Sequence, residues 1–271
     1  MAKLPEDFGQ YTLIRRLGVG GMAEAYVARR RGPGDFEQYV CIKRILGAYQ
    51  DNPRFVKHFL REASLVARLR HSNITQVLDH GEIDGNYYLA LELVEGLDLR
   101  ELILKLQEHH ECLDIDFVVH IAVELAHALD FAHTTVHRGE ASPILHRDIS
   151  PSNVLVSVQG EVKLSDFGIA KAMNQASTML TASGQTKGKT HYMAPEYAAG
   201  KGYGPEADLY ALGITLFESL SAERPYEGDN VLDILSRALR GEHRSLKELR
   251  SDVPDALIEI VHRLIHPDAR Q

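Results

Sequence analysis

The sequence predicts an α+β protein in which a small strand-rich part is followed by a larger helical part. Up to about residue 95, short runs of β-branched and aromatic residues are separated by turns that contain glycine and proline. After Gly96 the apolar residues recur at helical spacing instead. The length of 271 residues is sufficient for about two compact units or one large domain.

The strand-rich part is expected to contain several short strands and one helix. A glycine cluster at 18–21 separates the first two strands, and Asn52-Pro53 introduces the helix, in which apolar residues from Phe55 to Leu69 have helical spacing. The expected strands lie at 11–17, 25–28, 38–43, 75–78 and 87–94.

The helical part is expected to contain one long amphipathic helix and one buried helix. Apolar residues from Phe117 to Ala132 recur at i, i+4 intervals, which predicts a helix over 115–133. Gly204-Pro205 opens a mostly apolar run, which predicts a buried helix over 205–220. Two further helices are expected near 229–240 and 254–265.

Two segments of the helical part are expected to be loops. Residues 173–190 are rich in Ser, Thr, Gln and Gly, and loops longer than about 15 residues in a compact domain are usually functional or disordered. Residues 134–142 are expected to form a solvated surface loop, with a docking role as the alternative.

The composition excludes several classes of protein. Hydrophobic and charged fractions of 44% and 25% are typical of a globular protein and exclude a disordered or collagen-like chain. A net charge of −8 argues against nucleic acid as a main partner. The apolar runs are too short for a membrane span, and the first residues lack the apolar core of a signal peptide. Cys41 and Cys112 do not form a CxxC pair, which favours a reducing, cytoplasmic setting.

The glycine cluster is the first motif with a chemical interpretation. A dinucleotide-binding fingerprint requires a helix after the glycines, whereas residues 25–28 predict a second strand. The cluster is therefore expected to be a flap between two strands, folded over phosphates. A tight hairpin that binds nothing is the alternative for this motif alone. The flap contains Leu17, Gly18, Val19, Gly20 and Gly21.

Lys43 ends an apolar strand, so its ammonium group is expected to need a nearby anion. Glu62, in the following predicted helix, is a candidate partner. The alternative is that both side chains are simply solvated, as most Lys and Glu side chains are.

The segment His146-Arg147-Asp148 and the later Asn153 form a more specific pattern. A carboxylate and an amide five residues apart on a polar turn can accept a hydroxyl proton or hold a divalent cation. Asp166-Phe167-Gly168 follows a short predicted strand, and the oxygen ligands Asn153 and Asp166 suit Mg²⁺. An Asx-type turn is the alternative for either motif alone.

With these motifs in this order, the chain resembles a eukaryotic-type protein kinase domain, in particular the bacterial Hanks-type serine/threonine protein kinases. The resemblance runs from about Tyr11 to the last residue. It also rests on His71-Ser72-Asn73-Ile74, Ala194-Pro195-Glu196 and Asp208-Leu209-Tyr210-Ala211-Leu212-Gly213.

The resemblance implies a bilobal protein-kinase-like fold within one domain, 1–271. A small antiparallel-sheet N-lobe would span about 11–95 and a larger helical C-lobe about 97–271. It also implies an ATP- and Mg²⁺-dependent enzyme that transfers the γ-phosphate of ATP to Ser or Thr hydroxyls of protein substrates in bacterial signal transduction.

Further roles follow from the resemblance, residue by residue. Lys43 would hold the α- and β-phosphates and pair with Glu62. Asp148 would orient the substrate hydroxyl and accept its proton, while Asn153 and Asp166 would ligate Mg²⁺. ATP would contact Leu17, Gly18, Val19, Gly20, Gly21, Ala25, Cys41, Lys43, Leu91, Glu92, Val94 and Leu155.

The resemblance implies two further contacts away from the nucleotide. His146 and Phe167 would stack in the core that supports the catalytic residues. Glu196 would pair with Arg270.

The sequence departs from the family pattern around the nucleotide. Ala23 replaces a third glycine, which stiffens the flap slightly. Ala25 and Cys41 stand where the family has a valine and an alanine that sandwich adenine, so the total volume is nearly kept.

Two departures concern charge near the transferred phosphate. Ser150 stands where the family usually has lysine, and Lys189 stands where it usually has threonine. We expect Lys189 to supply the missing cation, since the site gathers phosphate charge. The alternative is a solvated loop lysine in a weak enzyme or a pseudokinase that acts as an ATP-binding scaffold.

The loop between Asp166 and Glu196 is expected to be autophosphorylated. Arg147 precedes Asp148, the arrangement with which the family receives a loop phosphate, and a phosphate adds about −1.5 to −2 charge. A solvated loop without this role is the alternative. The expected sites are Thr181, Ser183 and Thr186.

The remaining expectations concern other ligands and the rest of the protein. The histidine-rich segment 109–112 has no matching second half elsewhere, so zinc is not expected. A small-molecule kinase is disfavoured by Ala194-Pro195-Glu196. The family continues with another helix after the position of Arg270, so we expect a C-terminally truncated domain from a longer protein. Membrane anchoring and dimerisation of that protein are compatible with the sequence but not specified by it.

Overall fold

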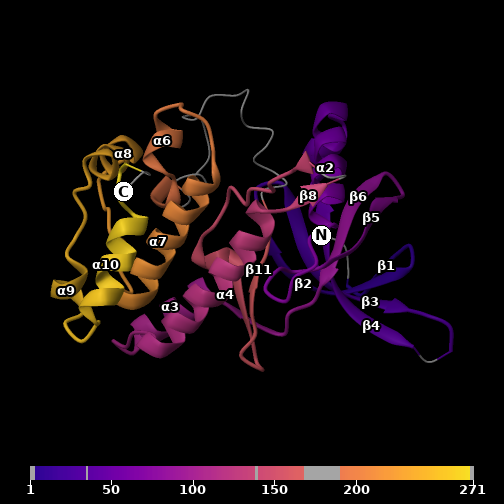
Figure 1. Ribbon diagram of the computed structural model, residues 1–271. Coiled ribbons are helices and arrows are strands. Elements are labelled where there is room, and N and C mark those ends of the chain that lie inside the picture. The colour runs from indigo at the N-terminus through magenta and orange to yellow at the C-terminus, as the bar shows by residue number, and fades with distance from the viewer. Residues whose placement is uncertain (1–3, 35, 138–139, 168–189, 269–271) are drawn as a thin grey trace. The chain divides into compact units, whose positions relative to one another are not determined.

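The computed structural model describes residues 4–34, 36–137, 140–167 and 190–268 (Figure 1). The chain divides between Glu95 and Gly96 into two units. We call the described residues up to Glu95 the small unit and those from Gly96 onward the large unit.

The sheet of the small unit has six antiparallel strands in the order β1-β2-β3-β4-β6-β5. Most strands lie close to their predicted positions, but β1 was not predicted and β5 extends well past the predicted stretch. Strand β1 has only three residues, which is too short for an alternating pattern to show in the sequence. Its pairing with β2 makes it a strand. Strand β5 contains the polar run from Asp79 to Glu82, and its pairing with β6 at the sheet edge makes it a strand. The strands are β1 (Glu6–Phe8), β2 (Tyr11–Val19), β3 (Ala23–Arg31), β4 (Glu37–Ile45), β5 (Val77–Ile83) and β6 (Asn86–Glu92).

Helix α2 (Pro53–Val66) begins where the sequence predicted it, after the short helix α1 (Gly47–Gln50). The Asn52 side chain accepts hydrogen bonds from the backbone amides of Arg54 and Phe55, at 3.1 and 3.2 Å. These contacts satisfy amides that the first helical turn leaves unpaired, and Pro53 fits the first position because it has no amide hydrogen.

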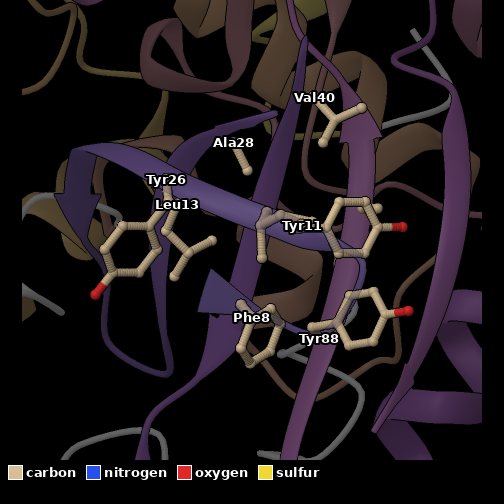
Figure 2. Close-up of a cluster of buried hydrophobic side chains, with 9 residues drawn as sticks. Phe8, Tyr11, Leu13, Tyr26, Ala28, Val40 and Tyr88 are labelled. Carbon is tan, nitrogen blue, oxygen red and sulfur yellow. The ribbon is translucent and has the colours of Figure 1, made fainter. Parts of the chain in front are cut away.

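The core of the sheet is a cluster of nine buried side chains on one face (Figure 2). The rings of Phe8 and Tyr11 each meet Tyr88 edge-on, with centroids 5.6 Å apart. The hydroxyl groups of Tyr11 and Tyr88 point to the same side in Figure 2. Both hydroxyl groups donate to the Asp79 carboxylate, at 3.0 and 2.9 Å. The hydroxyl of Tyr26 points away from them. The cluster consists of Phe8, Tyr11, Leu13, Tyr26, Ala28, Val40, Ile42, Tyr88 and Ala90.

Helices α4 and α7 form the centre of the large unit and confirm the two main helix predictions. Helix α4 spans Ile115–His133, and α7 spans Pro205–Ser221. From Ala207 to Ser221, every residue of α7 except Leu209 is buried, because α4 and α10 pack against it (Figure 1). The other helices are α3 (Leu99–Glu108), α6 (Pro195–Ala198), α8 (Val231–Arg240), α9 (Leu246–Leu249) and α10 (Asp255–Leu264).

The large unit also contains short strands and single helical turns. Strands β7 (Gly96–Asp98), β10 (Val154–Ser157) and β11 (Val162–Leu164) form an antiparallel sheet in the order β11-β10-β7. The 3-10 turns are η1 (Pro151–Asn153) and η3 (Thr190–Tyr192).

The segment 134–142 is not simply a loop, as the sequence analysis expected. It contains the hairpin of β8 (Val136–His137) and β9 (Glu140–Ala141). Val136 is 63% exposed, so backbone pairing rather than burial makes these residues strands, and no apolar pattern reveals them. Among the described residues, no helix has the length and apolar character needed to cross a bilayer.

Candidate active site

The glycine flap is the hairpin between β2 and β3 in the small unit. Gly18 lies opposite Ala25 across the hairpin, and the turn closes with a 2.8 Å hydrogen bond from the Gly20 amide to the Ala23 carbonyl. A Cβ atom added to Gly18 would meet no described atom within 4 Å. The fold of the small unit therefore does not require glycine at this position, and the bare backbone leaves room for a ligand to approach.

Four predicted nucleotide contacts, Ala25 on β3, Cys41 and Lys43 on β4 and Leu91 on β6, share one face of the sheet. The strand register sets Ala25 opposite Lys43, and Cys41 opposite Leu91. Directly opposed residues of antiparallel strands project to the same face, and successive residues alternate. Ala25 and Cys41 are thus diagonal neighbours rather than directly opposed. The buried cluster of Figure 2 occupies the other face.

Glu62 is half-buried on α2, three residues after the buried Phe59 and one before the buried Ala63. This position is on the packed side of the helix. Its pairing with Lys43 stays a prediction. At the end of the sheet, the Glu92 amide donates to the Gln76 carbonyl at 2.9 Å, and Val94 follows outside the strand.

In the large unit, the structure brings Asp148 and Asn153 together. The Asn153 side-chain nitrogen donates to the Asp148 carboxylate at 3.1 Å and to its backbone carbonyl at 2.6 Å. The Ser165 backbone amide and side-chain hydroxyl both donate to the backbone carbonyl of Asn153, at 2.8 and 3.1 Å. These bonds connect the segment that carries Asp148 and Asn153 with Ser165. Because Ser165 immediately precedes Asp166, they also fix the backbone next to Asp166.

His146 supports this network from the core. Its ring is fully buried and lies 4.5 Å from the Phe167 ring, so the expected contact between the two rings is present. Its Nδ1 accepts from the Asp148 amide at 3.2 Å, so the neutral ring carries its hydrogen on Nε2, which donates to the Ser165 carbonyl at 2.8 Å. Burial lowers the pKa of His146 and thereby favours this neutral form.

The acceptor that anchors the segment His146-Arg147-Asp148 is Asp208, at the start of α7. Its carboxylate is fully buried and accepts from the backbone amides of His146 and Arg147, both at 2.8 Å. It also accepts from Tyr203 at 2.6 Å and from His133 at 2.8 Å. Burial alone would raise the pKa of Asp208, but these hydrogen bonds offset it and hold the pKa below its usual range.

From the sequence, Asp208 was recognised only as part of a motif without an assigned role, and neither His133 nor Tyr203 was predicted to contact it. The available signal was an aspartate at the start of a helix that is otherwise mostly apolar. A charged group in such a helix needs buried partners, but the sequence does not say which.

Strained backbone marks two residues of the site. Arg147 and Asp166 have φ angles of 65° and 62°, the left-handed region that non-glycine residues seldom adopt. Such conformations persist where surrounding contacts fix them, and they cluster at functional sites. The Asp208 bond to the Arg147 amide is one such contact.

Three further residues of the sequence prediction, Ser150, Leu155 and Glu196, lie in the large unit. Leu155 is half-buried in β10, between Asp98 and Lys163 of the neighbouring strands. Ser150 is 5% exposed, and its carbonyl accepts from the Asn153 amide. Glu196 lies in α6. Lys189, Thr181, Ser183, Thr186 and Arg270 lie outside the described residues.

Comparison with known families identifies the fold. The model of the protein kinase domain matches residues 11–271. The chain belongs to the protein kinase domain family. The crystal structure of the PknI kinase domain of Mycobacterium tuberculosis aligns with a TM-score of 0.71 at 28% identity, covering 100% of this chain and 93% of that one. The predicted kinase fold, with an antiparallel sheet and a helical lobe, is therefore confirmed.

Curated relatives of this kinase domain are bacterial protein kinases. It is 40% identical over 96% of its length to the tyrosine-protein kinase MasK of Myxococcus xanthus. It is 34% identical over 96% of its length to the probable serine/threonine-protein kinase PknB of Lactococcus lactis, and 35% identical over 93% to the serine/threonine-protein kinase PrkC of Bacillus subtilis. The chain spans 40%, 39% and 37% of these relatives' own lengths. The predicted resemblance to bacterial serine/threonine kinases is confirmed.

Proposed function

We propose that this kinase domain transfers the γ-phosphate of ATP to serine or threonine hydroxyls of proteins, with Asp148 as the base. The observation that carries the proposal is the network of Asp148, Asn153 and Ser165, held at its base by Asp208. Phosphoryl transfer depends mainly on positioning and charge neutralisation, and a catalytic segment fixed by buried hydrogen bonds provides positioning.

The residues present fit Mg²⁺. The Asn153 amide nitrogen is engaged by Asp148, which orients its carbonyl oxygen as the metal-binding atom. Together with the Asp166 carboxylate it forms an all-oxygen donor set, and Mg²⁺ prefers a few such ligands plus phosphate oxygens. The bound ion would neutralise charge on the phosphates. Lys43 would hold the α- and β-phosphates, and the backbone amides of the flap would contact the phosphates.

We propose that Lys189 supplies the cation that Ser150 cannot. Ser150 is buried and uncharged, so a phosphate moving toward the substrate needs another positive group. Replacement of Lys189 by Ala should lower kcat by about 10- to 1,000-fold, and Lys189→Arg should restore part of it. Equal kcat in Lys189→Ala and the wild type would contradict this role.

We also propose that Thr181, Ser183 and Thr186 are autophosphorylated. Support comes from Arg147, whose buried Nε has no hydrogen-bond partner among the described residues. A loop phosphate would satisfy this donor. Mass spectrometry of the fully active protein should find phosphate on this loop, and an unmodified loop at full activity would contradict the proposal.

A tyrosine acceptor is a second candidate, favoured by the 40% identity with a relative named as a tyrosine-protein kinase. A pseudokinase that binds ATP as a scaffold is a third, favoured by Ser150. We further propose that the two units are lobes of one catalytic domain that works in the cytoplasm, where the thiols of Cys41 and Cys112 would stay reduced.

One experiment separates these candidates. The purified chain is incubated with labelled ATP, Mg²⁺ and a generic protein substrate, and the products undergo phosphoamino-acid analysis. Asp148→Asn should reduce incorporation by about 10²- to 10⁴-fold, whereas Asp116→Asn, an exposed aspartate of the same unit, should not. Phosphotyrosine alone would favour the second candidate. ATP binding without Asp148-dependent incorporation would favour the third and contradict the proposal.

A further inference from the structure

A network of charged groups lies on the small unit's sheet, on the face opposite the nucleotide contacts. At its centre is Arg44, the residue after Lys43. Its guanidinium donates to Glu6 at 2.8 Å, and to Glu24 and the Tyr26 hydroxyl at 3.3 and 3.0 Å. The Tyr26 hydroxyl in turn donates to Glu24. We call Glu6, Glu24, Tyr26 and Arg44 the Arg44 network.

Strand register sets this network directly behind the proposed ATP contacts. Glu24 lies opposite Arg44, and the next pair along the two strands is Ala25 opposite Lys43. Because neighbouring residues of a strand project to opposite faces, Arg44 is fixed on one side of the backbone that presents Lys43 on the other. Glu24 and Ala25, which are consecutive residues of β3, likewise project to opposite faces of the sheet.

The network also holds the flap. Glu24 is the second residue of β3, directly after the turn that closes the glycine hairpin, and Arg16 of β2 lies 3.8 Å from its carboxylate. The Leu46 amide donates to the Met22 carbonyl at 2.9 Å, which ties the end of β4 to the same turn. Both arms of the flap thus connect to the end of β4 that carries Lys43 and Arg44.

The N-terminal strand β1 completes the network from across the sheet. In strand order β1 is separated from β4 by β2 and β3, yet the Glu6 carboxylate reaches Arg44 because the sheet curls around the cluster of Figure 2. The Arg44 guanidinium carbon lies 5.8 Å from the Phe8 ring centroid and 5.1 Å from that of Tyr26, within range of cation–π attraction.

The four groups are partly shielded and comprise one positive charge, two carboxylates and a neutral hydroxyl. The side chains of Arg44, Glu24 and Glu6 are 16%, 22% and 25% exposed, so their interactions are screened less than those of surface pairs. The hydrogen bond from Tyr26 and the nearby Arg44 lower the pKa of Glu24. Removal of Arg44 would leave two carboxylates facing each other.

We propose that Arg44 is a positioning residue for ATP, which fixes the strands that carry Ala25, Lys43 and the glycine flap, and that Glu6 of the N-terminal strand thereby controls ATP affinity. This inference rests on the proposed function, since it takes the opposite face of the sheet as the nucleotide face.

The test is a matched pair of carboxylate-to-amide variants, Glu6→Gln and Glu37→Gln. Glu37 pairs with Arg29 at 3.1 Å on the same sheet, but Arg29 is four residues from Ala25 along β3, roughly 13 Å away. Direct titration with Mg·ATP, KM for ATP, kcat and the thermal midpoint are measured for both variants and the wild type.

Glu6→Gln should raise the Kd and the KM for ATP about fivefold, with kcat within about twofold of wild type and the midpoint within about 4 °C. Glu37→Gln should leave all four values near wild type. Arg44→Met should raise Kd further, and Arg44→Lys should recover part of the loss, because lysine keeps the charge but not the forked geometry.

Wild-type Kd in Glu6→Gln, or the same rise in both glutamate variants, would overturn the proposal. If Arg44→Met does not fold, Glu6→Gln decides alone. Because the readout is binding, a wild-type chain that binds Mg·ATP without transferring phosphate would contradict the proposed function and still leave this test decisive.

Discussion

The small and large units hold their candidate site residues by different physical means. In the small unit, strand register and the partly exposed Arg44 network fix the residues proposed to bind ATP. In the large unit, the fully buried Asp208 carboxylate accepts four hydrogen bonds and thereby anchors the segment that carries Asp148, the proposed base. Partly solvated charges contribute little to stability, whereas a buried charge that loses its partners is strongly destabilising.

The difference suggests a division of labour. A partly exposed network can be altered with less effect on folding than a fully buried one, so changes in the small unit should appear mainly in nucleotide affinity. A buried acceptor cannot be altered without leaving donors unpaired, so changes in the large unit should appear in folding and turnover together.

The largest expected effect is that of Asp208→Asn. The side-chain nitrogen of the introduced asparagine would face a donor that bonds to an Asp208 oxygen in the wild type. That donor would lose its acceptor, so the free energy of unfolding should fall by about 3–5 kcal/mol. Urea denaturation measures this change. Asp252→Asn is the control, because Asp252 is 64% exposed in its pair with Arg250, and its effect should be below about 1 kcal/mol.

A loss below about 1 kcal/mol in Asp208→Asn would break the comparison between the units. If that variant is insoluble, Tyr203→Phe replaces it. This change removes a single donor to the buried Asp208 carboxylate and should cost about 1.5–3 kcal/mol.

The second prediction is a pH dependence of stability that originates in the large unit. Burial lowers the pKa of both His146 and His191 in the folded state. As pH falls below about 6.5, the unfolded chain takes up protons that the folded chain refuses, so stability should fall by up to about 1.4 kcal/mol per pH unit for each histidine. At higher pH this loss disappears.

Urea denaturation at pH 7.5, 6.5 and 5.5 tests this prediction. His191→Gln should reduce the slope, whereas His58→Gln, a change at an exposed position of the small unit, should not. A flat profile for the wild type would show that these histidines accept protons in the folded state.

The smallest expected effect is that of Glu24→Gln on stability. Glu24 is 22% exposed and keeps its hydrogen-bonding shape as glutamine, so the free energy of unfolding should fall by less than about 1 kcal/mol. Titration with Mg·ATP should nevertheless show weaker binding. A loss of several kcal/mol with unchanged ATP affinity would reverse the proposed division between the units.

Local patterns in the sequence predicted much of the fold. The i, i+4 stripe gave the bounds of α4, and Asn52-Pro53 located the start of α2 because the cap and the first turn are local structures. Strand β1 and the β8–β9 hairpin were missed because only pairing with another segment makes them strands.

The candidate site divides in the same way. Its residue types and order, from the flap through Lys43 to Asp148, Asn153 and Asp166, could be recognised from the sequence, and their roles remain predictions. That Asn153 bonds to Asp148 is accessible in principle, since the two are five residues apart.

The sequence by itself determined the family, the main helices and the identity of the residues proposed to act on ATP, because these depend on short-range patterns. Only the tertiary structure decided that Asp208 anchors residues 61 and 62 positions away, and that Glu6 reaches Arg44 across 38 positions. Such contacts arise when distant segments pack around a shared core, and no periodicity along the chain encodes which buried or half-buried charge will meet which partner.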